Sequence, residues 1–204
     1  MEVSYHTFPS GKQYIYIVKD GTPIFLRNIL FITRAANPRE IAIVREWSAP
    51  PARSARSNKG AWEPPKGQME WKDLGGRPRT LTSATLLRHM RAGILREITE
   101  EAKFLPKELS HVRRLPTHYI QDWPESGVPG AKFMYQYWQA VASDEAMAKA
   151  QARMKELVDH PDWKHLLPAD LTEKDAVQWW QPEDGWDLIR ASFSKKMTKL
   201  YYAS

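Results

Sequence analysis

Arg96-Glu97-Ile98-Thr99-Glu100-Glu101 is the stretch from which the fold of this chain can be read. Leu87, Ile94 and Ile98 recur at helical spacing just before and within it, which predicts an amphipathic helix. At about 100° per residue, Glu97, Glu100 and Glu101 share one face of that helix. Three clustered carboxylates repel one another unless a cation such as Mg²⁺ or Mn²⁺, which takes oxygen ligands, binds between them. The cluster is therefore either a solvated acidic face or a metal site, and we favour the metal site.

The hexapeptide resembles the helical half of the Nudix box. That pattern reads Gly, five residues, Glu, seven residues, then Arg-Glu-φ-x-Glu-Glu-x-Gly-φ, where φ is apolar. Upstream, Trp62-Glu63-Pro64-Pro65-Lys66-Gly67 looks like the Trp-x-x-Pro-Lys-Gly motif of Nudix enzymes that act on mRNA caps, diphosphoinositols and dinucleoside polyphosphates. Two separate motifs in the family's order strengthen the resemblance. It implies an α/β Nudix fold, a mixed β-sheet sandwiched between α-helices.

The chain departs from the pattern in three ways. Twenty-eight residues separate Gly67 from Arg96, where the pattern has thirteen, and we place the insertion at 68–83. Counted back from Arg96, the position of the early Glu is Arg88, and the position of the late Gly is Lys103. Glu70 stands near the place of an acidic residue found in many members. We expect one Nudix domain over 1–204, in which 1–28 form an N-terminal strand extension.

What the resemblance implies for the site is a divalent cation, Mg²⁺ or Mn²⁺, and a phosphoanhydride substrate. Glu97, Glu100 and Glu101 would bind the metal with the help of a carbonyl near Gly67, and one glutamate, not assigned by the sequence, would be the general base. Arg96 would orient the carboxylates. The expected substrate-binding residues are Lys66, Trp62, Glu70, Arg77 and Arg79.

Composition bounds the possible partners. The 204 residues are 42% apolar and 26% charged, which is typical of a soluble globular domain. The absence of cysteine excludes disulfides and thiolate-bound zinc and fits a reducing cytoplasm. No apolar run reaches 18 residues, so we expect no membrane span. The net charge of +6 suits a polyanionic partner, a nucleotide or a capped RNA.

Three functions remain open. A capped RNA or a dinucleoside polyphosphate is the first substrate class, because of the Trp62–Gly67 motif and the basic loops at 48–59 and 72–79. A diphosphoinositol polyphosphate would need the same basic loops. A Nudix-fold nucleotide- or RNA-binding module that has lost catalysis is the alternative outside the enzymes, and the missing early Glu and Lys103 favour it.

Periodicity and turn residues predict the remaining elements. Asp20-Gly21 should form a hairpin turn, and Thr82 or Ser83 should cap the helix that carries the hexapeptide. A second helix should begin at a cap formed by Ser143 or Asp144. The predicted strands are 14–18, 24–26, 29–33, 41–44, 131–141 and 176–180, and the predicted helices are 84–105, 143–158 and 185–192.

Overall fold

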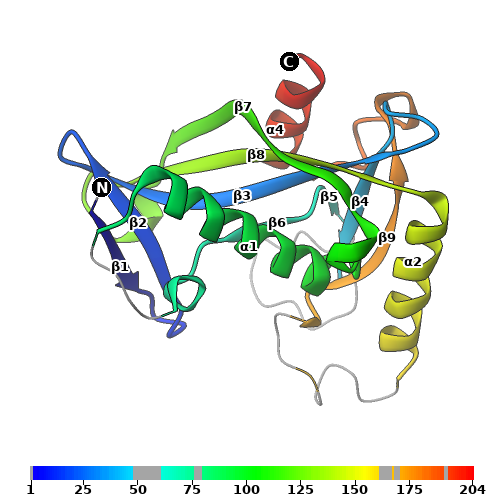
Figure 1. Cartoon of the computed structure of the whole chain (residues 1–204), viewed down its shortest axis with the longest axis horizontal. Helices are drawn as coiled ribbons and strands as arrows, with labels where there is room; N and C mark the ends of the chain where they lie inside the picture. The colour runs from blue at the N-terminus through cyan, green and yellow to red at the C-terminus, as the bar shows by residue number, and fades with distance from the viewer. Residues whose placement is uncertain (1, 48–60, 76–79, 161–166, 168–170, 191–192) are drawn as a thin grey trace. The chain divides into compact units, whose positions relative to one another are not determined.

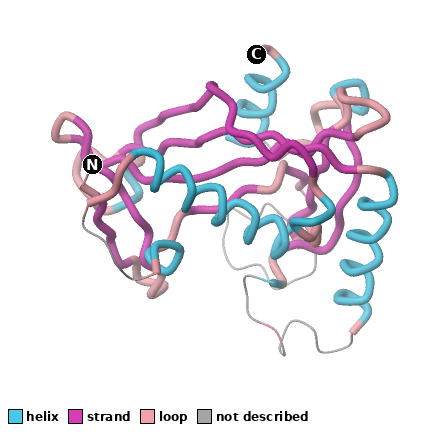
Figure 2. Tube along the Cα trace, in the orientation of Figure 1, coloured by secondary structure: helices cyan, strands magenta, loops and turns pink. Residues whose placement is uncertain are grey.

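The computed structural model describes residues 2–47, 61–75, 80–160, 167, 171–190 and 193–204. The described chain is built mainly of strands, with three longer helices (Figure 2). None of its helices is long and apolar enough to cross a membrane. The helices are α1 (Ser83–Glu101), α2 (Asp144–Asp159) and α4 (Phe193–Tyr202), and the strands are β1 (Val3–Thr7), β2 (Gln13–Lys19), β3 (Thr22–Arg34), β4 (Ile41–Glu46), β5 (Trp62–Glu63), β6 (Lys66–Gln68), β7 (Ser110–Asp122), β8 (Lys132–Ala142) and β9 (Lys174–Trp180) (Figure 1).

The strands pair into one open sheet, with the order β1-β2-β3-β4-β5. Off this path, β6 and β8 pair with β3, β7 pairs with β8, and β9 pairs with β4. This mixed sheet with three α-helices is the α/β class expected from the sequence. The chain clusters into two compact units, which are described separately below. The first unit is Met1–Ile29, Lys66–Arg96 and Arg114–Trp138, and the second is Leu30–Pro65, Glu97–Arg113 and Gln139–Ser204.

In the first unit, β1, β2 and the first part of β3 form an antiparallel meander. The turn between β2 and β3 has positive φ at both Asp20 (49°) and Gly21 (75°), the geometry of the tight hairpin predicted there. Aromatic rings fill this unit: Trp123 lies 5.0 Å from Phe25 and 4.5 Å from Phe133, measured between ring centroids. These contacts link β3 to β8 through the segment after β7.

In the second unit, β4 is the central strand. The side chains of residues 41–44 are fully buried, and β4 pairs with β5 on one side and β9 on the other. Helix α2 packs against β9, and Gln151 donates from its amide to the carbonyl of Val177 at 3.0 Å. Helix α4 packs through Tyr201, whose ring stacks on Phe31 at 3.9 Å.

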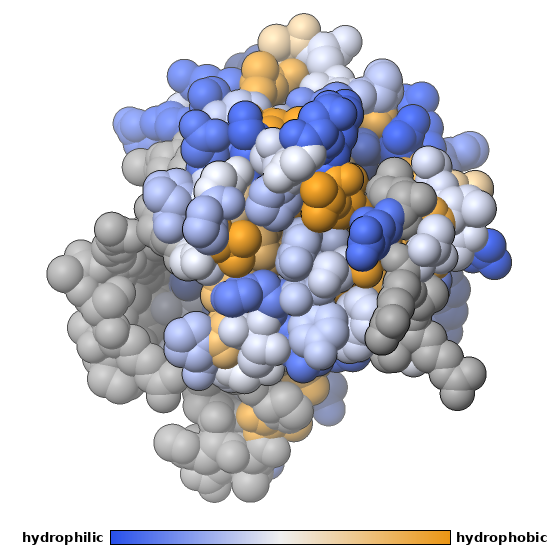
Figure 3. Space-filling view, turned by 90° about the vertical axis from the view of Figure 1, so that its left-hand side faces the viewer, coloured by the Kyte–Doolittle hydropathy of each residue, from blue (hydrophilic) through white to orange (hydrophobic). Residues whose placement is uncertain are grey.

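Exposed large apolar side chains are scattered over the described residues. On the face shown in Figure 3, hydrophobic residues occur as separate patches among polar ones. Such isolated exposure is normal for a folded domain and does not by itself indicate an interface. The most exposed are Tyr5, Val18, Ile120, Leu188 and Leu200.

Three predicted elements differ from the structure. The strands expected at 24–26 and 29–33 are one continuous strand, β3, since every residue from Ile29 to Ile32 is buried and no turn residue interrupts it. Helix α1 ends at Glu101, four residues before the predicted end, because Lys103 has a left-handed backbone with φ 60°. The helix predicted at 185–192 was wrong over its described residues: after a short 3₁₀ turn at Pro182–Asp184, residues 185–190 are not helical, and α4 begins at Phe193.

Candidate active site

An ion pair joins Asp73 to the hexapeptide. The guanidinium of Arg96 donates from Nε to Asp73 Oδ1 at 3.1 Å and from Nη2 to Oδ2 at 3.4 Å. The Asp73 side chain is only 7% exposed, so water screens this pair weakly. Counting from Gly67, Asp73 is the sixth residue, the position of the early Glu of the Nudix pattern. Counted back from Arg96, the same position is Arg88, which is exposed on α1.

The segment that carries Asp73 lies close against α1. The buried stripe of α1 runs through Leu86, Met90 and Ile94, with Leu86 in place of the predicted Leu87. The Thr82 hydroxyl accepts from Thr85 N–H at 3.1 Å, which confirms the predicted cap. A β-carbon on Gly93 would lie 2.9 Å from Met69 Sδ, so glycine at this position permits the close approach.

Gly67 is fixed in place by buried polar contacts within the first unit. It lies in β6, opposite Asn28 of β3. The Asn28 side chain is 1% exposed and fully used: it donates to Met69 Sδ and to the Met90 carbonyl, both at 3.2 Å, and accepts from Trp138 Nε1 at 2.9 Å. One side chain therefore connects β3, the strand that holds Gly67, helix α1 and β8.

Arg27 lies beside Gln68, the residue that follows Gly67. Its Nη2 donates to Gln68 Oε1 at 3.1 Å, and its guanidinium carbon lies 4.7 Å from the centre of the Phe133 ring. The buried Nε of Arg27 and Nε2 of Gln68 have no hydrogen-bond acceptor among the described residues. Two buried polar donors next to the Gly67 strand are thus without an acceptor in the described part of the chain.

In the second unit, Glu101 belongs to a buried charge cluster. Lys174, the first residue of β9, places its Nζ 3.5 Å from Glu101 Oε1 and 2.8 Å from Glu63 Oε1. The side chains of all three residues are 7% exposed or less. Burial lowers the pKa of Lys174, but Glu63, Glu101 and Glu46 together raise it above its ordinary value. The ammonium is therefore charged at neutral pH.

The three predicted metal ligands lie in different environments. Glu101 is buried against Lys174, whereas Glu97 and Glu100 are half-buried and accessible to solvent. No group of three or more acidic or histidine side chains in the described part of the chain is arranged to hold a metal ion. The carboxylates have the right chemistry for Mg²⁺ or Mn²⁺, but the contact of Glu101 with the Lys174 ammonium does not fit such an ion at Glu101. The metal role of Glu97, Glu100, Glu101 and Gly67 stays a prediction.

Lys103 stands where the Nudix pattern has its late glycine. It keeps the left-handed conformation that a helix commonly adopts just past its end, although it has a side chain. Its ammonium donates to the Glu100 carbonyl at the end of α1 and to the Leu171 carbonyl at 2.9 Å. Burial lowers the pKa of Lys103, while Glu100 and Glu101 partly oppose the shift. These contacts stabilise Lys103 in a left-handed backbone conformation, which is unfavourable for a residue with a side chain.

The remaining predicted residues are placed as follows. Trp62, in β5, has the Arg45 guanidinium 5.5 Å from its ring centre, and Glu70 forms an ion pair with Lys72 at 3.2 Å. Lys66 lies half-buried in β6. Arg77 and Arg79 lie outside the described residues.

Two site residues were missed. Asp73 was recognisable, because counting forward from Gly67 instead of back from Arg96 reaches it. Lys174 had no local signal, since it lies far along the chain from Glu63 and Glu101 and stands at the start of an ordinary strand.

No protein-family model and no curated protein matches the chain, but solved structures do. An Ap4A hydrolase from C. elegans is 18% identical with a TM-score of 0.46, over 88% of this chain and 96% of that chain. The NUDIX domain of Shewanella oneidensis NrtR in complex with ADP ribose is 13% identical with a TM-score of 0.45, over 88% and 86%. A MutT/Nudix family protein from Listeria innocua is 13% identical with a TM-score of 0.46, over 92% and 95%. The chain is similar to Nudix proteins, the family that its two motifs resemble.

Proposed function

We propose that this chain is a Nudix-type hydrolase that cleaves a phosphoanhydride bond in a nucleoside-diphosphate-linked compound. Its main support is the ion pair between Asp73 and Arg96. With Asp73 in the place of the early Glu, every charged position of the Nudix pattern has a counterpart here. The set is Asp73, Arg96, Glu97, Glu100 and Glu101.

The charge distribution supports an anionic substrate. Arg27 has no carboxylate partner among the described residues, and its Nε and the Gln68 amide nitrogen lack acceptors. Phosphate oxygens are suitable acceptors for a guanidinium and an amide. The chain as a whole carries a net charge of +6. The half-buried Arg27 guanidinium, next to Gly67, supports binding of a phosphate group near this strand.

The reaction that we propose is attack of water on phosphorus. A new P–O bond forms, the anhydride P–O bond breaks, and the proton of the water passes to a carboxylate. Because Glu101 is engaged by Lys174, we assign the role of general base to Glu97 or Glu100, which solvent reaches. Arg96, which donates to Asp73, is the residue that we assign to positioning rather than to catalysis.

Within this reaction class, a capped RNA or a dinucleoside polyphosphate is the first substrate. The Trp62–Gly67 motif and the basic residues at Arg77 and Arg79 support it. A diphosphoinositol polyphosphate is the alternative, since it also needs cationic residues around several phosphates. The two substrate classes differ because a capped RNA or a dinucleoside polyphosphate contains nucleobases, against which Trp62 would stack, and a diphosphoinositol does not.

A binding module without catalysis is a second candidate. The observation that favours it is the contact between Lys174 and Glu101, because it engages one carboxylate of the cluster internally. Such a protein would bind the same nucleotides without cleaving them.

The test is a substrate panel with Mg²⁺ or Mn²⁺: a capped RNA, a dinucleoside polyphosphate and a diphosphoinositol. Glu97→Gln and Glu100→Gln are compared with Glu145→Gln, an exposed glutamate of α2. We expect turnover of at least one substrate, and loss of the general base should lower kcat by about a hundredfold or more. Saturable binding without turnover by the unmodified chain would establish the binding module instead.

A further inference from the structure

Lys174 lies among acidic side chains that come from three separate stretches of the chain. Its Nζ is 2.8 Å from Glu63, 3.5 Å from Glu101 and 3.6 Å from Glu46. Glu63 and Glu101 are buried, and Glu46 is the outermost of the three, with a side chain that is 37% exposed. A cation surrounded by three carboxylates is the arrangement that a bound metal ion would also produce.

The carboxylate of Glu63 has both oxygens occupied. Oε1 accepts from Lys174, and Oε2 accepts from the Ser194 hydroxyl at 2.8 Å and lies 3.5 Å from Arg190 Nη1. Arg190 also reaches Glu46 at 3.5 Å, and its backbone N–H donates to the Trp62 carbonyl at 2.8 Å. A metal ion at Glu63 Oε1 would have to displace Lys174, since Ser194 and Arg190 occupy the other oxygen. The cluster is therefore built around the ammonium.

The charges of the cluster explain why the ammonium is needed. Without the ammonium, the two buried carboxylates would be unfavourable in their ionised forms. Burial opposes their charge, and so does the repulsion between them. Lys174 supplies a positive charge within the protein, and Arg190 supplies a second one at the half-exposed side.

We propose that Lys174 is a built-in cation that takes the place of a divalent metal ion at Glu101. While Lys174 is present, Glu101 is not a metal ligand, and the glutamates of α1 that remain for an ion are Glu97 and Glu100. The proposal rests on the site of the proposed function and refines it. Its test measures ion binding without substrate, so either proposal can fail alone.

A purely structural ion pair is the competing explanation, and it makes different predictions. Removing the ammonium from a structural pair would destabilise the protein, and added metal would not reverse the loss. Removing a built-in cation opens a place for an ion between Glu63 and Glu101. Metal should then bind there and restore stability.

The experiment titrates Mn²⁺ into the full chain and counts bound ions by the electron paramagnetic resonance signal of free Mn²⁺. The variants are Lys174→Met and the double variant Lys174→Met/Glu101→Gln, with Lys155→Met as the matched control. Lys155 is a lysine of the same unit that is 76% exposed and paired with Asp159. Glu101→Gln alone completes the set.

We expect Lys174→Met to bind one more Mn²⁺ per chain than the unmodified protein, and the double variant to lose that ion. In EDTA, the melting temperature of Lys174→Met should fall by about 10 °C, and Mn²⁺ should recover most of the loss. Glu101→Gln alone should leave the number of bound Mn²⁺ ions unchanged, and Lys155→Met should change neither measurement.

The same number of ions in Lys174→Met as in the unmodified chain would overturn the proposal. So would loss of Mn²⁺ binding in Glu101→Gln alone, since Glu101 would then be a ligand beside Lys174. If Lys174→Met does not fold, Lys174→Gln replaces it, because the amide still donates to Glu63 but carries no charge. The extra ion and the recovery by Mn²⁺ are then judged in that variant.

Discussion

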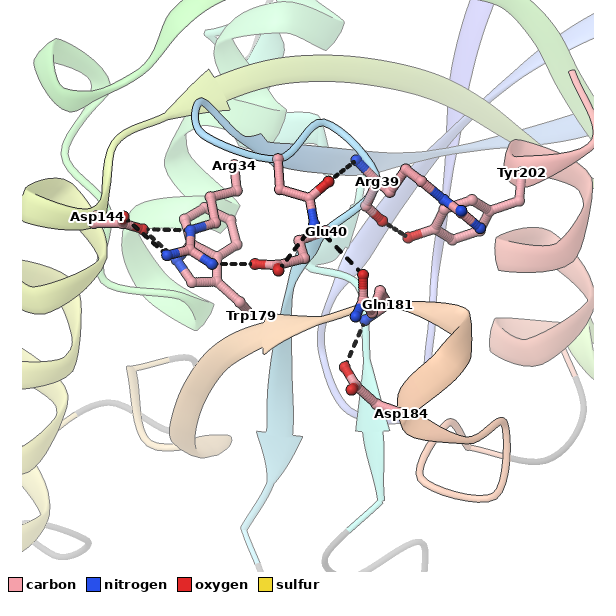
Figure 4. A network of polar contacts seen from close by, with 9 residues as sticks. Arg34, Arg39, Glu40, Asp144, Trp179, Gln181, Asp184 and Tyr202 are labelled. Carbon is pink, nitrogen blue, oxygen red and sulfur yellow. Dashed lines mark hydrogen bonds and ion pairs between the residues drawn. The ribbon is translucent and has the colours of Figure 1, made fainter.

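Two ionic clusters of the second unit neutralise their acids in different ways. Around Lys174, one buried ammonium serves three carboxylates. Around Arg34, each carboxylate oxygen of Asp144 and Glu40 accepts a directional hydrogen bond (Figure 4). Arg34 pairs with both oxygens of Asp144, at 2.6 and 3.0 Å, and donates to Glu40 at 2.7 Å. The Arg34 side chain is 31% exposed and Asp144 is 55% exposed, whereas Lys174 is 4% exposed.

The Arg34 cluster connects the ends of elements. It joins the end of β3 to the start of β4 and to the start of α2, and Trp179 of β9 donates to Asp144 at 3.1 Å. Further hydrogen bonds extend the network through Gln181 and, from Tyr202 of α4, to the Arg39 carbonyl at 2.6 Å (Figure 4). A planar guanidinium suits this task, because it binds several oxygens in fixed directions. An ammonium is a point charge, which suits a site surrounded by acids.

The largest difference in stability between the two clusters is expected when the central cation of each is removed. We expect Lys174→Met to lower the free energy of unfolding by about 3–5 kcal/mol, because it leaves buried carboxylates unpaired. Arg34→Met should lower it less, since water solvates Asp144 when the partner is gone and Asn37 still donates to Glu40. Urea unfolding of both variants in EDTA measures the difference. Equal losses would show that burial does not distinguish the clusters.

A smaller effect should appear inside the buried cluster. Glu63 accepts from both Lys174 and Ser194, so these contacts should depend on each other. We expect Glu63→Gln and Ser194→Ala to be coupled by about 1–2 kcal/mol in a double-mutant cycle, as for a hydrogen bond to a charged group. Unfolding free energies of the two single variants and the double variant give the coupling. Additive losses would mean that the Ser194 hydrogen bond contributes nothing to the cluster.

What the sequence could predict was set by local patterns. Helix α1, its Thr82 cap, the Asp20-Gly21 turn and β8 each follow from residues that are neighbours along the chain. Strand β7 was missed, because Arg113, Arg114 and Pro116 interrupt the apolar alternation that identifies a strand, and its outer face is polar. Helix α4 was misplaced, because the segment from Gly185 contains helix-forming residues but, as far as Arg190, is held in a non-helical path by backbone hydrogen bonds with Trp62.

The candidate site also has a part that local patterns predicted and a part that they did not. The hexapeptide and the Trp62–Gly67 motif are local, and they contain Arg96 of the Asp73 pair and Glu63 and Glu101 of the charge cluster. The partners of Glu101 are not local, since Glu63, Glu101 and Lys174 meet only because β5, α1 and β9 pack together in the second unit. No spacing rule predicts such a meeting. The expectation of three equivalent glutamates on one helix face was therefore incomplete, because it described the helix without its neighbours.

The smallest expected effect concerns the pH and salt dependence of the exposed cluster. The Arg34 guanidinium holds the pKa of Asp144 below its ordinary value of 3.8, and Trp179 contributes to the same shift. A carboxyl group whose pKa is lower in the folded state stabilises the protein above its ordinary pKa, and it loses that contribution as the pH falls through the folded-state pKa. The stability difference between the unmodified chain and Asp144→Asn should thus be constant above about pH 5 and shrink below about pH 4.

Added salt should reduce the same difference at neutral pH, because the Debye length falls from about 10 Å at 0.1 M to about 3 Å at 1 M. Urea unfolding of both proteins at pH 3, 5 and 7, each at low and high sodium chloride, gives the comparison, with Lys174→Met as the buried counterpart. Its deficit at pH 7 should change little with salt, since water and ions do not reach Glu63 and Glu101. If salt reduces both deficits equally, the buried cluster is open to solvent, and the physical contrast between the two cations is wrong.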